Sequence, residues 1–508
     1  MEEQTNNRTI IKNTFFLYFR MMFTMLVSLY TSRVILQVLG IDDYGIYQVV
    51  GGIVGFFTFL NVALATGTSR FLTFELGKNN FEKLQRTFSM ALTVHIGLAI
   101  LIVLLAETIG LWFLHNKMVI PVDRMDAVVF TYQISVFTMV FTITQAPYSA
   151  SIMAHERMSI YAYVSIFETL MKLLIVYILT LIDIDKLKLF SLLGLLVSVG
   201  FMCFYRYYCT KHFPETKYRF VYDKSILKSI TNFSGWSLMG NAAVALNSQG
   251  ILILINMFFS PAVVAARAIS IQVFMAINQF VGNFRTAVNP QIIKKYASGD
   301  KEGSKKLLLE STKYSFFLLL VLGLPIIFLA SQILNLWLGV VPEYSVIFLQ
   351  LVLVESFFQL FNNSLYVALY AKGQLKENAL ITPIILFVNF PIIYILFKMG
   401  YSPIVLSWIS MISYAILGVI VKPILLVKIV GYRWSDIWSV FRPCFLVTIL
   451  AIPIPLCMTA KGPLSSIYYS FAILVVTLIV TSVSIYVCGI DRDTRKKILS
   501  FIRNKISR

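Results

Sequence analysis

The sequence predicts an all-α integral membrane protein of about 14 transmembrane helices. Apolar residues make up 58% of the 508 residues and charged residues only 13%, whereas soluble domains average about 45–50% apolar and about 25% charged. A helix that spans a bilayer needs about 20 mostly apolar residues. Such stretches lie at roughly 14–38, 44–69, 87–113, 127–153, 158–182, 187–209, 230–259, 262–289, 314–337, 344–371, 378–398, 402–427, 441–459 and 464–488.

Lysine and arginine are distributed unevenly between alternate connecting segments. With both termini on one side, 32 of the 43 Lys and Arg residues fall on that side, Lys422 in segment 422–442 among them. Only 6 fall on the other side, and five lie within spans. This bias follows the positive-inside rule and predicts both termini in the cytoplasm. We therefore expect the net charge of +19 to set the orientation of the protein in the membrane and to attract anionic lipid head groups. We expect no nucleic-acid partner.

The two halves of the chain are weakly similar to each other. Ala154-His-Glu-Arg precedes the stretch 158–182, and Ala371-Lys-Gly-Gln precedes the stretch 378–398, at a constant offset of 217 residues. Six spans in each half would give two parallel six-helix repeats plus two C-terminal helices. That is a transporter architecture with the substrate site between the halves. Chance similarity between apolar helices is the alternative.

These observations divide the chain into four parts. We predict an N-terminal lobe over 1–209, a basic cytoplasmic loop over 210–229, a C-terminal lobe over 230–430, and two last helices with a basic cytoplasmic tail over 431–508. The breaks Gly77-Lys-Asn-Asn and Gly299-Asp-Lys-Glu occupy equivalent places in the two lobes. The tail is expected either to lie on the inner leaflet as an amphipathic helix or to be solvated.

Arginines inside the spans are the first candidates for substrate binding. A charge within a span costs a few kcal/mol and usually faces a protein interior or a water-filled cavity. Arg267 and Arg285 are about five helical turns apart, so they point the same way about 27 Å apart along the axis. Asn278 lies between them near the same line, and Arg33 lies near the outer end of the first span. Snorkelling of each arginine to lipid head groups is the alternative.

Acids and amides supply the remaining candidates. Glu355 and Gln359 share one helix stripe, which either lines a cavity, with Glu355 as the ion-coupling residue, or forms a helix contact. Glu168 and Lys172 are one turn apart and would form either a structural ion pair or a contact to substrate and coupling ion. Asn241 belongs to an amide-rich stretch that would offer hydrogen bonds to sugar hydroxyls.

Catalytic signatures are absent from the sequence. We find no Walker A loop, no HExxH, no GxSxG and no His/Cys cluster with metal-ligand spacing. We therefore predict no catalytic residue, no metal site, no enzymatic activity, and no cofactor other than H⁺ or Na⁺ as a coupling ion.

The segment between the first two spans carries a specific pattern. Residues 33–47 read Arg-Val-Ile-Leu-Gln-Val-Leu-Gly-Ile-Asp-Asp-Tyr-Gly-Ile-Tyr, and residues 68–71, Thr-Ser-Arg-Phe, close the second span. With the six-plus-six-plus-two arrangement of spans, this pattern resembles the polysaccharide-transport branch of the multidrug/oligosaccharidyl-lipid/polysaccharide (MOP) exporter superfamily, the Wzx-type flippases of lipid-linked oligosaccharides. The resemblance covers essentially the whole chain.

The resemblance implies MATE-like lobes around a cavity that opens alternately to each side. The implied substrate is an undecaprenyl-diphosphate-linked oligosaccharide of O-antigen (lipopolysaccharide), capsule or exopolysaccharide biosynthesis. It would be flipped across the bacterial cytoplasmic (inner) membrane and passed to polysaccharide polymerase machinery. A diphosphate is suited to binding by arginine. A lipid II flippase, a multidrug cation/H⁺ or Na⁺ antiporter of the same fold, and a membrane-embedded polysaccharide polymerase or ligase are the alternatives.

Overall fold

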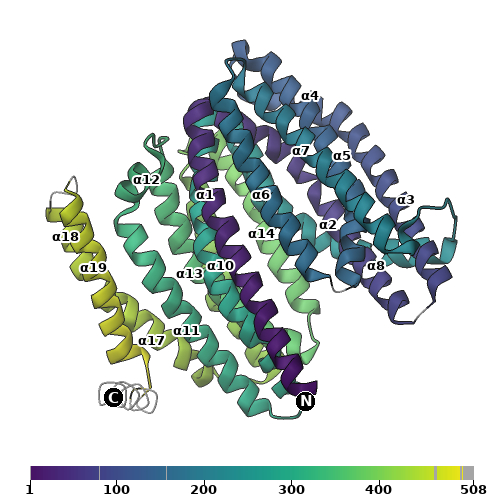
Figure 1. Cartoon of the computed structure of the whole chain (residues 1–508). Coiled ribbons are helices and arrows are strands. Elements are labelled where there is room, and N and C mark those ends of the chain that lie inside the picture. The colour runs from purple at the N-terminus through teal and green to yellow at the C-terminus, as the bar shows by residue number, and fades with distance from the viewer. Residues whose placement is uncertain (1, 79, 156, 463–465, 492–494, 496–508) are drawn as a thin grey trace. The chain divides into compact units, whose positions relative to one another are not determined.

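The computed structural model describes residues 2–78, 80–155, 157–462, 466–491 and 495 (Figure 1). Within this described part the chain is helical and has no strand. Twelve of the described helical segments are long and apolar enough to cross a membrane, which confirms the predicted all-α membrane fold. The chain forms two compact units, Met1–Ala268 and Ile269–Arg508. The four-part division predicted from the sequence stays a prediction.

The first unit is built from helices joined by short turns, and the boundary with the second unit falls inside α10. Its elements are α1 (Glu2–Phe56), α2 (Thr58–Gly77), α3 (Phe81–Leu105), η1 (Ala106–Gly110), α4 (Leu111–Lys117), η2 (Val122–Arg124), α5 (Met125–Ala154), α6 (Met158–Leu181), α7 (Lys186–His212), η3 (Pro214–Thr216), α8 (Lys224–Ala245), η4 (Leu246–Gly250), α9 (Ile251–Phe258) and α10 (Pro261–Ala297). In this unit α5 packs on α7, α2 on α8, and α1 on α6.

The second unit is built in the same way. Its elements after α10 are α11 (Lys301–Phe328), α12 (Ala330–Leu338), α13 (Ser345–Lys372), α14 (Lys376–Lys398), α15 (Val405–Ala415), η5 (Ile416–Val421), α16 (Lys422–Leu425), η6 (Leu426–Val430), α17 (Trp434–Ala451), α18 (Pro453–Lys461), α19 (Ile467–Ser484) and η7 (Ile485–Gly489). Here α11 and α15 pack on α13, and α17 packs on α11 and α19. The segments η1, η4, η5, η6 and η7 are π-helical.

The predicted turn between the first two spans lies at Gly40. This residue has φ 80° and ψ 172° inside α1, a backbone conformation that is essentially restricted to glycine. The predicted span 44–69 therefore occupies the end of α1 and all but the last turns of α2. The predicted span 230–259 lies in α8, η4 and α9, where the chain passes from α-helix to π-helix and back.

Gly45, which follows Tyr44 after this turn, lies where α1 and α10 approach each other closely within the first unit. A Cβ atom on Gly45 would lie 2.0 Å from the carbonyl oxygen of Pro261, the first residue of α10. Further along α1, Gly52 and Gly55 face η4 and α9, where added Cβ atoms would touch Leu252 and Gln249 at 3.5–3.7 Å. The glycines thus allow α1 to pack tightly, as expected for small residues between membrane helices.

The predicted repeat is visible in the helix boundaries. Moved by the offset of 217 residues, α6 would occupy 375–398, and α14 runs from Lys376 to Lys398. The two glycine-marked breaks are also followed by helices with the same kind of N-cap. Asn80 caps α3 by accepting a hydrogen bond from the Lys83 N–H at 3.0 Å. Asp300 caps α11 by accepting one from the Gly303 N–H at 2.8 Å. Each cap satisfies an N–H that the first helical turn leaves unpaired.

Apolar side chains fill the interior of each unit and also cover much of its surface. In the first unit Phe88 meets Tyr148 with ring centroids 5.2 Å apart, and in the second Phe316 stacks on Phe361 at 5.2 Å. Large apolar side chains such as Leu104, Leu196 and Ile449 are nevertheless exposed. An apolar exterior of this extent suits lipid and not water.

Candidate functional site

The candidate residues of the predicted cavity are divided between the two units. The first unit contains Arg33 (α1), Glu168 and Lys172 (α6), Asn241 (α8) and Arg267 (α10); the second contains Asn278 and Arg285 (α10), and Glu355 and Gln359 (α13). A single cavity that unites them stays a prediction.

Arg267 is the most deeply buried of these cations. It is 4% exposed, and its neighbours Val263 to Ala266 on α10 are also buried. In the second unit Arg285 is half-buried, and its Nε atom is buried without a hydrogen-bond acceptor in the described part of the chain. Asn278 donates to the Phe274 carbonyl of its own helix at 3.2 Å. Both guanidinium groups therefore lie inside helices that are apolar enough to span a membrane.

Polar side chains also gather where α1 meets α6. Lys172 and Glu168 form an ion pair at 2.9 Å, with side chains 61% and 45% exposed. This confirms the ion pair that their spacing allows, while a contact to substrate stays a prediction. On α1, Tyr47 lies within electrostatic reach of Lys172. The hydroxyl groups of Tyr30 and Tyr177 are 3.3 Å apart.

Arg33 follows Tyr30 by three residues on α1, so the two side chains are neighbours on the surface of this helix. Arg33 is half-buried. Asn241 of α8 is also half-buried. Both residues keep the predicted place within the helices of the first unit.

The stripe on α13 packs inside the second unit. Glu355 is buried, and Gln359 shares a hydrogen bond with the Tyr414 hydroxyl of α15. One turn along, a Cβ atom on Gly418 of η5 would lie 3.3 Å from the backbone nitrogen of Asn362 on α13. The stripe thus meets α15 and η5 directly, as the helix-contact interpretation expects. Ion coupling by Glu355 stays a prediction.

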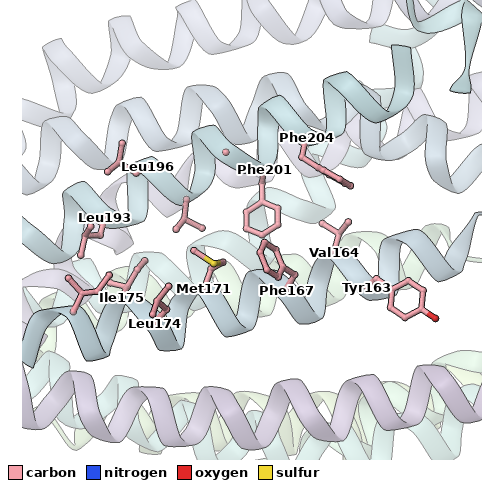
Figure 2. A pocket seen from close by; sticks show the side chains of 13 residues that line it. Tyr163, Val164, Phe167, Met171, Leu174, Ile175, Leu193, Leu196, Phe201 and Phe204 are labelled. Atoms are coloured by element: carbon pink, nitrogen blue, oxygen red, sulfur yellow. The ribbon is translucent and has the colours of Figure 1, made fainter. Parts of the chain in front are cut away.

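An apolar groove of about 550 Å³ lies between α6 and α7 (Figure 2). The side chains of both helices point into it, and Phe167 meets Phe201 with ring centroids 5.9 Å apart. Along α6 the groove runs from Tyr163 to Ile178, about 22 Å at the helical rise. Gly200 leaves open space at the α7 wall, because an added Cβ atom would meet no atom within 4 Å.

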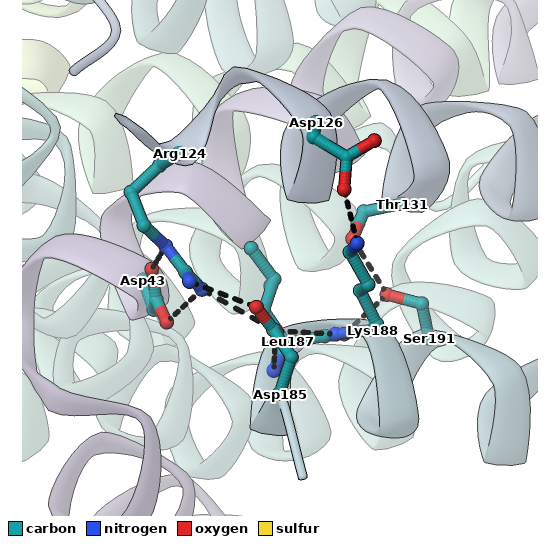
Figure 3. A network of polar contacts seen from close by, with 8 residues as sticks. All are labelled: Asp43, Arg124, Asp126, Thr131, Asp185, Leu187, Lys188 and Ser191. Atoms are coloured by element: carbon teal, nitrogen blue, oxygen red, sulfur yellow. Dashed lines mark hydrogen bonds and ion pairs between the residues drawn. The ribbon is translucent and has the colours of Figure 1, made fainter. Parts of the chain in front are cut away.

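A network of ion pairs joins three segments of the first unit that lie far apart in the sequence (Figure 3). Arg124 of η2 donates to both carboxylate oxygens of Asp43 at 2.9 and 2.6 Å. It also donates to Asp185 at 2.8 and 3.4 Å. Asp185 in turn caps α7 by accepting from the Leu187 and Lys188 N–H groups, each at 3.1 Å. Arg124 thus ties the turn after Gly40 to the start of α7.

The position of Asp185 determines its charge state. Burial acts to raise the pKa of this carboxyl group, but the hydrogen bonds from Arg124 and from two backbone N–H groups outweigh it and hold the pKa below its usual range. The Asp185 carboxylate is therefore ionised at neutral pH.

Sequence reasoning missed one buried cation in the second unit. Lys422 was placed in a cytoplasmic segment, but it is only 1% exposed. Its ammonium group donates to the Asn378 side chain and, at 3.3 Å, to the Thr382 hydroxyl, both on α14. It also lies 5.5 Å from the centre of the Tyr366 ring on α13. The signal that could have found it is its position inside the apolar stretch 402–427, five residues before the end of that stretch.

Metal ligands do not gather in the described residues, where no three His, Cys, Asp or Glu side chains come together. Beside the carboxylates described above, the polar side chains of both units include cations, amides and hydroxyl groups. Such groups can bind anions and sugars by hydrogen bonds and charge.

Parts of the chain are similar in sequence to a known family and to a known membrane protein. Residues 17–178 match the MatE family. The chain is 22% identical over 328 residues to the uncharacterized membrane protein EpsK of Bacillus subtilis (strain 168), and the match covers 64% of this chain and 64% of that protein.

Solved structures are similar over a longer part of the chain. The lipid II flippase MurJ in an inward closed conformation has a TM-score of 0.68 at 13% identity, over 93% of this chain and 98% of that one. An inward-facing multidrug resistance MATE family transporter of the MOP superfamily has a TM-score of 0.62 at 15% identity, over 79% of this chain and 95% of that one. The chain is therefore a multi-pass membrane protein in which residues 17–178 match the MatE family, and its fold is similar to that of these MurJ and MATE structures.

Proposed function

We propose that this protein flips an undecaprenyl-diphosphate-linked oligosaccharide from the cytoplasmic to the outer leaflet of a bacterial inner membrane by alternating access. The observation that carries the proposal is Arg267, a cation 4% exposed within a membrane-spanning helix. The fold shared with a lipid II flippase supports a lipid-linked substrate. Polysaccharide polymerase machinery would act on the flipped product.

The diphosphate explains why arginines would lie in these helices. A guanidinium group inside a span is costly, and a phosphate that arrives there offsets this cost through charge-assisted, bidentate hydrogen bonds. Arg285 has a buried Nε–H to offer, since this atom donates to no acceptor in the described part of the chain. Arg33 and Arg267 would bind the diphosphate at other stages of transport.

The oligosaccharide and the lipid tail need different surroundings. Amide side chains such as Asn241, Asn278 and Gln359 would donate to sugar hydroxyls. The polyprenyl tail would lie in the apolar groove between α6 and α7, whose length of about 22 Å follows much of the roughly 30 Å hydrocarbon core. Tyr163 and Phe204 line this groove together with aliphatic side chains.

Export of organic cations is the rival function within the same fold. A cation-binding cavity would need available carboxylates. In the described first unit Glu168 is paired with Lys172 at 2.9 Å, and Glu107 accepts a hydrogen bond from Gln133 at 2.9 Å. The charge of Glu168 is thus balanced by Lys172, which favours an anionic substrate, whereas the hydrogen bond from Gln133 leaves the charge of Glu107 in place.

A deletion strain complemented with variants tests the proposal. Arg267→Ala, Arg285→Ala and Arg33→Ala should each reduce surface polysaccharide and raise the lipid-linked repeat-unit pool of the inner leaflet at unchanged protein level. Arg86→Ala is the matched control, because Arg86 forms an exposed ion pair with Glu82 at 2.6 Å. Normal glycan in the deletion strain, with new sensitivity to cationic drugs, would favour the rival function.

Ion coupling belongs to the same proposal. Glu355 is buried in α13, where it would take up H⁺ or Na⁺ during the cycle. Glu355→Gln should then uncouple transport from the ion gradient and leave substrate binding intact. Glu168→Gln should have a smaller effect, because Glu168 is held by Lys172.

A further inference from the structure

The second unit carries a basic pocket of about 540 Å³. It lies where α13 ends, α14 begins and η6 ends. Lys372, Lys376 and Lys428 line it together with a single acid, Glu377. None of the three lysines forms an ion pair within the described residues. The pocket is therefore a concave surface with an excess of positive charge.

The turn between α13 and α14 is held in a defined shape. Gly373 ends α13 in the left-handed conformation, with φ 76°, and the Gln374 N–H donates to the Leu369 carbonyl at 3.2 Å. The ammonium group of Lys372 donates to the Ile429 carbonyl of η6. This bond joins the α13 wall of the pocket to the η6 wall.

The start of α14 adds to the positive potential. Its N-cap residue, Leu375, has no side chain that can accept a hydrogen bond from the first turn. The first-turn N–H groups and the helix dipole therefore favour an anion at this end. Glu377 in the same turn partly offsets this potential.

A fourth lysine lies against the first turn of α14. Lys422 is buried, and its ammonium group donates to Asn378, two residues after Lys376 in the first turn of α14. The partners of Lys422 in this cluster are neutral, so its charge is not cancelled there. It lies in α16 between the π-helical segments η5 and η6, an irregularity that often occurs at functional sites.

We propose that this pocket binds the phosphate group of an anionic lipid head group. Lysine binds phosphate as a point charge, and basic pockets between membrane helices on the cytoplasmic side bind such head groups. The charge bias of the sequence predicts this end of the unit to be cytoplasmic. The site is separate from the arginines proposed to bind the transported diphosphate, and it does not depend on that function.

Lipid titration of the full-length protein tests the site. The purified protein in neutral detergent is titrated with phosphatidylglycerol, with phosphatidylcholine and with inorganic pyrophosphate, and bound ligand is counted by native mass spectrometry. The variant carries Lys372→Gln, Lys376→Gln and Lys428→Gln. The control carries Lys294→Gln, Lys301→Gln and Lys306→Gln, which removes the same charge from exposed lysines outside the pocket.

The expected result is phosphatidylglycerol binding that the pocket variant weakens by roughly 100-fold, since each lysine near an anionic surface contributes about fivefold. The control should lose less than about threefold, and Glu377→Gln should strengthen binding. Pyrophosphate binding that the pocket variant weakens to the same extent would support a phosphate-binding site, with a soluble phosphate compound and not a lipid as its ligand. Equal losses in variant and control, or no saturable binding of either anion, would overturn the proposal.

Discussion

Replacement of Arg124 should loosen the first unit where the turn after Gly40, η2 and the start of α7 meet. Arg124 makes four hydrogen bonds, two to Asp43 and two to Asp185, at 2.6–3.4 Å. Without the guanidinium group the two carboxylates would face each other across the site. Because one of them also caps α7, the start of that helix should fray as well.

The expected loss can be derived from burial. Removing one partner of a fully buried pair costs about 3–5 kcal/mol, and exposed pairs contribute about 0–1 kcal/mol. The side chains of Arg124, Asp43 and Asp185 are 27%, 18% and 28% exposed, so we expect about 2 kcal/mol for Arg124→Ala. For a unit of this size that corresponds to a decrease in Tm of about 4–8 °C.

Thermal unfolding in detergent, followed with a thiol-reactive dye, measures this decrease. Arg86→Ala is the matched control, because its pair with Glu82 is exposed on both sides, at 49% and 76%. Its Tm should change by less than about 2 °C. Arg124→Lys should be intermediate, since an ammonium group cannot bind two carboxylates bidentately. Equal changes for Arg124→Ala and Arg86→Ala would refute the reasoning.

Two further predictions concern pH and the groove. The lowered pKa of Asp185 means that its contribution to stability is present above its unfolded value of about 4 and is lost as the pH falls from there through the lower folded value. Asp185→Asn should therefore flatten the decrease in Tm below about pH 5, and an unchanged slope would contradict this. Gly200→Leu should fill the groove between α6 and α7 and slow flipping of a polyprenyl substrate about tenfold. Gly194→Leu, equally unhindered but outside the groove, should leave the rate within about twofold; equal rates for the two would show that the tail lies elsewhere.

Helix positions could be predicted because each depends on a local rule. Gly40 marks the turn in α1 since φ 80° with ψ 172° is accessible to glycine and strained for other residues. Asn80 marks the start of α3, and Asp300 marks the start of α11. In each case a side-chain oxygen of the N-cap residue accepts a hydrogen bond from a backbone N–H of the first turn. The offset of 217 residues also locates α14 from α6.

Tertiary pairings could not be predicted in the same way. Arg124 meets Asp43 and Asp185 across 81 and 61 residues, and no local pattern relates the three positions. Lys422 resembles a loop lysine because it stands near the end of an apolar stretch, and its partner Asn378 lies 44 residues away. The basic residues predicted for the amphipathic tail after 491, other than Arg495, lie outside the described residues.

Flipping by the purified protein tests the central claim most directly. The protein is reconstituted in liposomes with a fluorescent undecaprenyl-diphosphate-linked oligosaccharide, and the outer-leaflet label is quenched with dithionite over time. We predict protein-dependent flipping whose rate Arg267→Ala lowers at least about tenfold, because the loss of one charged hydrogen-bonding group costs about 1.5–3 kcal/mol. The control Arg86→Ala should leave the rate unchanged. Efflux of a cationic dye without any flipping of the glycolipid would contradict the account.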